Sequence, residues 1–127
     1  SGNVARARRV IEQLRSAGAV FALDDFGSGM ASFAYLKSLP VDFVKIEGSF
    51  VREMATDASS QVIVRSIVEA ANAFGMKTIA EWVEDEETYN RLAALGVDYA
   101  QGYFLGRAEP IGCPFSGLSL QFSTTVE

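Results

Sequence analysis

The sequence predicts an α/β fold in which about four parallel strands alternate with helices. In three segments a helical pattern ends at a glycine, a short apolar strand follows, and a polar residue stands at the strand's end. A fourth segment has Pro40 where the others have glycine. Repeated helix-to-strand units imply parallel strands joined by right-handed crossovers. The polar residues at the four strand ends are Asp24, Lys45, Glu81 and Gln101.

Apolar residues at helical spacing, flanked by capping and stop residues, predict four helices. They cover residues 3–17 with Asn3 as N-cap, 30–39 ending at Pro40, 58–74 with Asp57 as N-cap, and a stretch from the acidic group 84–87 to Leu95. Acidic residues are favourable at a helix start because the first N–H groups there are unpaired and the helix dipole is positive. The acidic group is therefore interpreted first as a cap, with a metal-binding role as the alternative.

Short apolar runs predict the strands, and such runs are typical of strands buried on both faces. The strands cover residues 20–23, 41–46, 77–80 and 98–101. Residues 49–55 fit a turn or a short helix. Beyond Gly106, Pro110 and other breakers remove the regularity, and 118–122 fits an edge strand or a tail. We therefore expect one domain over 1–111 and an irregular segment or edge strand over 112–127.

Composition limits the chemistry that this chain can perform. Sixteen acidic and eleven basic residues give a net charge of −5, which argues against binding a nucleic-acid polymer through its backbone. The absence of histidine excludes histidine-ligated zinc and Ser-His-Asp triads. The single Cys113 excludes an internal disulfide and suits a reducing compartment. No apolar run reaches the roughly 20 residues that span a bilayer, so no membrane contact is predicted for this segment.

The carboxyl ends of parallel strands are where α/β proteins bind ligands. Asp24, Lys45, Glu81 and Gln101, with Asp25 beside Asp24, are therefore expected to meet at one rim. Two adjacent carboxylates need a cation or a proton between them, and oxygen ligands favour Mg²⁺ or Mn²⁺. A nearby lysine can steady a phosphate, and a further carboxylate can bind a second metal or accept a proton from water. Such a rim suits metal-assisted phosphodiester hydrolysis, although strand-end polar residues also serve as caps or ion pairs.

Four motifs in order carry a resemblance to a known family. They are Asp24-Asp25-Phe26-Gly27-Ser28-Gly29, Leu39-Pro40-Val41-Asp42-Phe43-Val44-Lys45-Ile46, Ala80-Glu81-Trp82-Val83-Glu84 and Gln101-Gly102-Tyr103. With them the chain resembles the EAL domain family, bacterial signalling phosphodiesterases that hydrolyse cyclic di-GMP to linear pGpG. The resemblance runs from about residue 3 to Ile111. It implies a modified (β/α)₈ barrel, of which this chain would hold the second half, in a cytoplasmic protein or in the cytoplasmic part of a membrane-anchored one.

The resemblance also implies roles for individual residues. Asp24 would bind metal, shared by both ions in two-metal forms, Asp25 would serve the second ion, and Glu81 would be a second-site ligand or the general base. Lys45 would orient the attacking water or bind the scissile phosphate, and Gln101 would position the substrate. The segment Phe26, Gly27, Ser28 and Gly29, continuing into Met30 and Ala31, looks like the family's mobile loop, which couples metal binding to dimerisation.

Departures from the family pattern limit these expectations. Glu47 stands where the family commonly has aspartate, and a longer side chain can disturb a metal ligand. Trp82 stands where many members have glycine, and is expected to fill space in the rim. The Glu-Ala-Leu signature is missing, as are an asparagine and a glutamate of the first metal site, so only Asp24 of that site remains. The resemblance therefore predicts weak Mg²⁺ or Mn²⁺ binding and an isolated chain that is inactive.

Three alternatives stay open at this point. A half barrel would expose two sheet edges and part of its core, which favours self-association, for example as a homodimer. A non-catalytic receptor would bind cyclic di-GMP without turnover. A receiver-like phosphorylation domain would suit the length and the Asp24-Asp25 pair, but Lys45 comes too early, on the very next strand, and no phospho-acceptor aspartate precedes it at a middle strand end.

Overall fold

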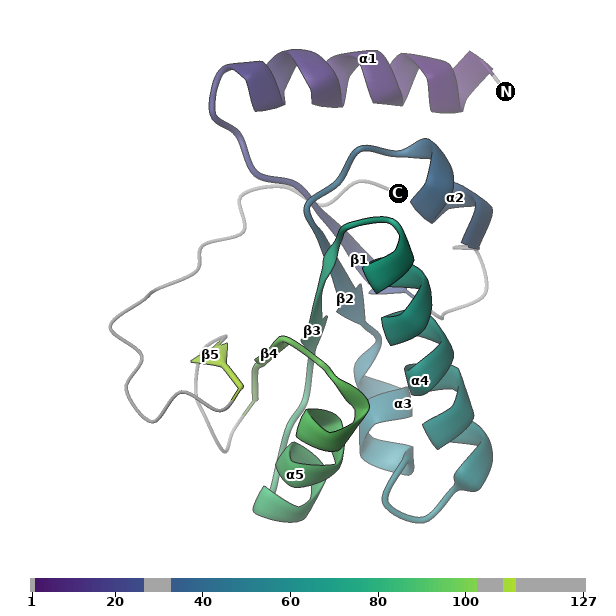
Figure 1. Ribbon diagram of the computed structural model, residues 1–127, viewed down its shortest axis with the longest axis vertical. Helices are drawn as coiled ribbons and strands as arrows, with labels where there is room; N and C mark the ends of the chain where they lie inside the picture. Colours follow the sequence, from purple (N-terminus) through teal and green to yellow (C-terminus); the bar gives the residue numbers. More distant parts are fainter. Residues whose placement is uncertain (1, 27–32, 103–108, 112–127) are drawn as a thin grey trace.

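The computed structural model describes residues 2–26, 33–102 and 109–111 (Figure 1). The elements in order are α1 (Gly2–Ser16), β1 (Ala22–Phe26), α2 (Phe33–Ser38), β2 (Phe43–Ile46), α3 (Gly48–Glu53), α4 (Ala58–Ala73), β3 (Lys77–Ala80), α5 (Glu86–Leu95), β4 (Tyr99–Ala100) and β5 (Glu109–Pro110). The predicted loop residues Gly27, Ser28, Gly29, Met30 and Ala31 lie outside the described residues, as does the segment 112–127 with its possible strand.

The sheet has the order β1-β2-β3-β4-β5. The first four strands run parallel, as predicted, and each pairs with the next in the sequence. A doubly wound sheet reverses its strand order in the middle, whereas a barrel wall keeps the chain order. The topology therefore argues against the receiver-like alternative.

The fifth strand was not predicted from the sequence. Its two residues, Glu109 and Pro110, pair antiparallel with β4, and the Ile111 N–H donates to the Asp98 carbonyl at 3.0 Å. Pro110 was interpreted as a breaker because proline has no N–H for a ladder. At the edge of a sheet that missing donor costs little, so a proline is tolerated there.

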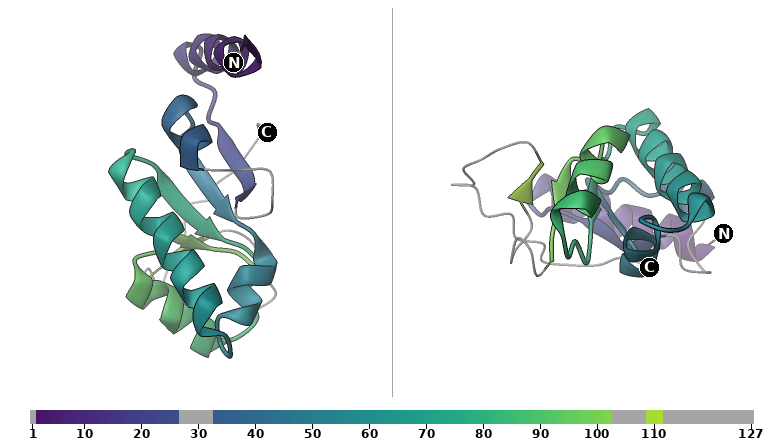
Figure 2. Two further views of the ribbon diagram at one scale, coloured as in Figure 1. Left: turned by 90° about the vertical axis from the view of Figure 1, so that its right-hand side faces the viewer. Right: turned by 90° about the horizontal axis from the view of Figure 1, so that it is seen from below.

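Helix α4 lies centrally against the sheet, in contact with β2, β3 and the helices α2, α3 and α5 (Figures 1 and 2). Its apolar stripe is buried as the spacing predicted, through Val64, Ile67, Val68 and Ala71. Phe74, which the same pattern included, is 40% exposed, because the helix ends at Ala73 and Phe74 is its C-cap. The strands β1, β2 and β3 supply much of the opposing core, including Leu23, Val44, Ile46 and Ala80.

Helix α1 lies beyond the amino end of the strands, apart from the other helices (Figure 1). Only Ile11 of this helix is buried, whereas Val10 and Leu14 are 47% and 46% exposed. An ion pair of 2.8 Å between Arg15 and Asp42 ties the helix to the start of β2, and Asp42 also accepts from the Phe21 N–H. The apolar pattern of this helix therefore predicted its existence correctly, but only part of the stripe is covered: Val4 and Ala7 pack against the core, whereas Val10 and Leu14 lie at the surface.

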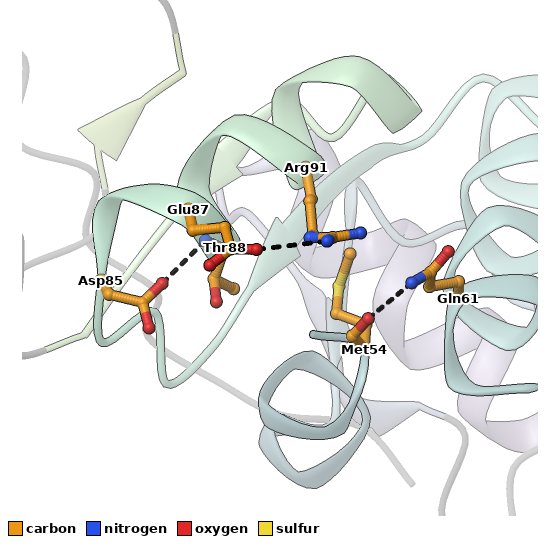
Figure 3. A network of polar contacts seen from close by, with 6 residues as sticks. All are labelled: Met54, Gln61, Asp85, Glu87, Thr88 and Arg91. Carbon is orange, nitrogen blue, oxygen red and sulfur yellow. Dashed lines mark hydrogen bonds and ion pairs between the residues drawn. The ribbon is translucent and has the colours of Figure 1, made fainter. Parts of the chain in front are cut away.

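The acidic residues before α5 act as a helix start, as predicted. Asp85 is the N-cap and accepts from the Thr88 N–H at 2.7 Å, and this bond holds the pKa of Asp85 below its usual value (Figure 3). Asp57 caps α4 in the same way, through the Ser59 N–H. The predicted N-cap Asn3 is wrong, because α1 already includes Gly2. Among the described helices, none has the length and apolarity needed to cross a bilayer.

Candidate functional site

The acidic pair Asp24-Asp25 belongs to strand β1. The sequence predicted a strand ending at Leu23 and then a loop, but β1 continues to Phe26. From Leu23 to Phe26 β1 advances three residues while β2 advances two, from Val44 to Ile46. This extra residue is a β-bulge, and bulges recur beside active sites because they change the direction of a side chain. The acidic pair thus lies at the bulge between β1 and β2.

A second irregularity follows β3. The Gln101 N–H donates to the Ala80 carbonyl, and the Gln101 carbonyl accepts from the Val83 N–H, both at 2.9 Å. In a regular parallel ladder, the two residues that bond to the N–H and the carbonyl of one residue are separated by a single residue. Here the two residues that bond to Gln101, Ala80 and Val83, are separated by both Glu81 and Trp82. The extra residue is accommodated by Trp82, whose φ of 61° lies in the left-handed region.

Gly102 permits the close approach that this second bulge needs. A Cβ atom at Gly102 would lie 2.3 Å from the Val83 carbonyl oxygen and 2.4 Å from the Val83 nitrogen. Both neighbours are backbone atoms, which cannot rotate away as a side chain can. The bulge that brings Glu81 and Gln101 together therefore requires a glycine at position 102.

Three of the predicted site residues form a charge cluster at the strand ends. The Lys45 Nζ atom at the end of β2 lies 3.2 Å from Glu81 Oε1, after β3, and 3.8 Å from Asp24 Oδ1, in β1. The side chains of Lys45 and Glu81 are 18% and 16% exposed, and that of Asp24 is 29% exposed. Parallel pairing of β1, β2 and β3 thus brings together residues that lie far apart in the sequence. Asp25 has its backbone in β1, and its side chain lies outside the description.

Burial is the largest cause of the raised pKa of Glu81. Removal of the carboxylate from water raises the pKa of Glu81 to about 7, and the ammonium group of Lys45 only partly opposes this shift. Asp24 contributes to this raised pKa in two ways, because a hydrogen bond between the two carboxyl groups requires a proton and because the negative charge of Asp24 disfavours a second one beside it. A carboxyl that exchanges its proton near neutral pH has the property required of a general acid or base.

The raised pKa predicts a pH dependence of stability in the metal-free protein. The folded state holds the Glu81 proton more tightly than the unfolded chain, so this stabilisation is complete below about pH 4.5 and is lost as the pH rises to about 7. The loss is on the order of 3 kcal/mol. Denaturant unfolding with a chelator should show it as a difference between the wild type and Glu81→Gln, whose amide cannot titrate. Parallel pH profiles of the two proteins would contradict the prediction.

An open cleft of about 640 Å³ adjoins the charge cluster, a volume typical of small-molecule sites. It is lined by Lys45, Arg52, Glu81, Trp82, Glu84, Gln101 and Gly102. Gln101, predicted to share the rim with Lys45 and Glu81, therefore does so. Arg52 was not predicted as a site residue, and Glu84 was considered only as part of the acidic group 84–87. No local pattern marks Arg52, because it reaches the cleft only through the placement of α3.

Two departures from the family pattern have structural explanations. Glu47 is the N-cap of α3, and its carboxylate accepts from the Ser49 N–H at 3.1 Å and from the Ser49 hydroxyl. This carboxylate is thus engaged in holding the start of a helix. Trp82 was expected to fill space in the rim, but its side chain lies on the cleft wall and is 46% exposed.

The metal ligands available among the described side chains are few. No group of three or more His, Cys, Asp or Glu side chains gathers within the part of the chain that the structure describes. Asp24 and Glu81 offer carboxylate oxygens, which suit Mg²⁺ or Mn²⁺. Lys45 lies between the two carboxylates and already balances part of their charge. The described residues therefore fit part of a metal site.

Comparison with known proteins places the chain in a family. The EAL domain model matches residues 2–108, and the chain belongs to the EAL domain family. The cyclic di-GMP phosphodiesterase PdeB of Shewanella oneidensis is 49% identical over 106 residues, which cover 84% of this chain and 12% of that protein. The resemblance seen in the sequence is thereby confirmed.

Solved structures agree with this assignment. The EAL domain of Mycobacterium smegmatis DcpA superimposes with a TM-score of 0.77 at 37% identity, over 84% of this chain and 48% of that one. The PaMucR phosphodiesterase, solved as a complex with c-di-GMP, gives a TM-score of 0.73 at 39% identity, over 81% of this chain and 42% of that one. The predicted fold class, parallel strands with helices from a TIM-type barrel, is confirmed. The chain spans about half the length of these solved chains.

Proposed function

We propose that this chain contributes the strand ends of β1 to β4 to a metal-dependent cyclic di-GMP phosphodiesterase site that produces linear pGpG. The contact of Lys45 with both Asp24 and Glu81 is the observation that carries the proposal. Three charged side chains, from β1, from β2 and from the residue after β3, form one partly buried cluster. A cleft large enough for a small molecule lies beside this cluster. The names of the relative PdeB and of the PaMucR complex support cyclic di-GMP as the substrate. The proposed setting is the bacterial cytoplasm.

Each residue has a proposed role that follows from its chemistry. Asp24, Asp25 and Glu81 would hold Mg²⁺ or Mn²⁺, which when bound lowers the pKa of water and offsets phosphate charge. The Lys45 ammonium would bind the scissile phosphate or orient the attacking water. Glu81, with its pKa raised to about 7, would accept the proton of that water if it is not a metal ligand. Gln101 would orient the substrate through its side-chain amide.

The isolated chain is proposed to lack turnover. The matched part of the chain corresponds to 48% of the DcpA EAL domain, and only two of its described carboxylates meet Lys45. A cation held by so few protein oxygens binds weakly, because water must fill each coordination position that the protein leaves open. Catalysis would then require the remaining part of the barrel.

A chimeric domain tests this function. Residues 2–111 would replace the matching stretch of the PaMucR phosphodiesterase, and pGpG would be measured by chromatography with Mg²⁺ or Mn²⁺ present. We expect turnover by the chimera and by unaltered PaMucR, but not by the 127-residue chain. A folded chimera that binds cyclic di-GMP in calorimetry without product would favour the receptor alternative. Turnover by the isolated chain, lost on Asp24→Ala, would overturn the proposed inactivity.

A second candidate function is self-association. The exposed Val10, Leu14 and Val20 on and after α1 are apolar side chains that a second copy could cover. Light scattering at micromolar concentration would report the mass of the particle. A folded monomer would remove this candidate, whereas a homodimer that dissociates on Leu14→Lys would support it.

A further inference from the structure

Trp82 combines three features of exposure, position and backbone conformation. Its indole is 46% exposed, it lines the cleft beside Lys45 and Gln101, and its backbone lies at a φ of 61°. Bulky residues seldom adopt the left-handed region, and such strain persists chiefly where the surrounding structure imposes it at a functional site. The strained backbone keeps an exposed aromatic ring on the wall of the cleft. Such strain is typical of functional sites, so we expect this ring to contact a ligand.

Helix α3 holds the indole in place. A Cβ atom at Gly48 would lie 2.2 Å from the Trp82 Cδ2 atom, so only a glycine lets the ring lie against the helix there. One turn further on, the Arg52 guanidinium carbon lies 4.8 Å from the centroid of the ring, a cation–π contact. Arg52 also lies 3.7 Å from Glu84, but both side chains are more than half exposed, so this ion pair adds little to the support of the ring. Both contacts come from α3, so the ring is supported by the helix while it still lines the cleft.

The cleft thereby offers two kinds of contact side by side. Lys45 supplies a positive charge for a phosphate, and Trp82 supplies an aromatic surface. A ligand that uses both must carry an anionic group and a flat ring, which is the chemistry of a nucleotide. Stacking between a base and an aromatic side chain requires no particular hydrogen-bonding edge. It therefore adds affinity that the metal and phosphate groups cannot supply.

We propose that Trp82, backed by Arg52, is a stacking platform for a purine base of the nucleotide ligand. The proposal rests on the proposed function, because Lys45 must face a phosphate for the base to reach the indole. It adds a residue that determines affinity for the base, distinct from the groups that face the phosphate and the metal. Glycine at this position could not provide such a surface.

Trp82 is the only tryptophan in the chain, so its fluorescence reports on the platform directly. The 127-residue protein would be titrated into the millimolar range with GMP, with cyclic di-GMP and with ribose 5-phosphate, which has the phosphate but no base. Stacking predicts quenching by GMP and cyclic di-GMP, and none by ribose 5-phosphate. Equal quenching by ribose 5-phosphate, or no quenching by any of the three, would overturn the platform.

Two matched variants separate stacking from bulk. Trp82→Phe keeps a flat ring and Trp82→Leu keeps only apolar volume, while both place a side chain on the same left-handed backbone. Calorimetry with GMP should show affinity about tenfold weaker for Trp82→Leu and within about threefold of wild type for Trp82→Phe. Equal affinities for the two variants would contradict stacking, and thermal melting would confirm that both are folded.

The platform and the proposed function can fail separately. If the chimera with PaMucR hydrolyses cyclic di-GMP but the Leu and Phe variants bind GMP equally, the platform is wrong and the function stands. If GMP quenches Trp82 and the variants differ as expected while the folded chimera produces no pGpG, the platform stands and the hydrolytic function is wrong.

Discussion

Replacing Glu81 with glutamine is expected to lower cyclic di-GMP hydrolysis by the PaMucR chimera about a hundredfold or more. Glutamine matches the shape of glutamate, but it can neither accept a proton from water nor offer a charged oxygen to a metal. Glu81 also lies 3.2 Å from the Lys45 ammonium, so the variant removes a partner of that cation. The measurement is pGpG production at saturating Mg²⁺ or Mn²⁺.

The control for this variant is a carboxylate of the same type outside the cleft. Glu87 lies on α5, where its exposed side chain pairs with Arg91 at 3.2 Å. Exposed ion pairs of this kind contribute little to stability, so Glu87→Gln should leave hydrolysis within about twofold of the parent chimera. If Glu81→Gln also stays within that range, the assignment of Glu81 to proton transfer or metal binding is wrong.

Replacing Gly102 with alanine is expected to lower the free energy of unfolding by about 3 kcal/mol. The added methyl group would meet the Val83 backbone at 2.3 Å, and one of the two segments must move. Movement breaks the hydrogen bond between the Val83 N–H and the Gln101 carbonyl, and it displaces Gln101 from the cleft. Denaturant unfolding monitored by circular dichroism measures the loss.

Gly75→Ala is the matched control, because it isolates the backbone conformation from the clash. Gly75 has a φ of +74°, yet no atom lies within 4 Å of an added Cβ. Its substitution should cost only about 1 kcal/mol, the strain of a left-handed alanine. Gly102→Ala should therefore be clearly more damaging than Gly75→Ala, and a similar cost for both would show that the contact with Val83 relaxes easily.

The regular elements were predicted well wherever a local signal was strong. Helix α4 begins at the predicted cap Asp57 and buries the predicted stripe, and strand β3 covers the predicted residues 77–80. A helical stripe and a short apolar run are properties of neighbouring residues, so each can be recognised without knowledge of the remaining chain. The exposed Phe74 and the wrong cap Asn3 lie at helix ends, where one residue more or less changes the environment completely.

The meeting of three charged residues at the rim was predicted, but the geometry of the strands that carry them was not. Asp24, Lys45 and Glu81 were placed together because parallel strands end at a common edge, and the structure brings them within an ion-pair distance. The bulge in β1 and the one after β3 have no sequence signal of their own, since both depend on the register with a neighbouring strand. The involvement of Arg52 likewise depends on where α3 packs.

The sequence by itself determined the alternation of strands and helices, the oxygen-rich and histidine-free chemistry of the rim, and the family resemblance. These depend on residue type and spacing alone. Only the tertiary structure decided that Asp24 lies within a bulged strand and that burial raises the pKa of Glu81 to about 7. It also decided that the ring of Trp82 packs against Gly48 of α3. Each of these depends on contacts between distant segments, because desolvation and packing are set by neighbours in space.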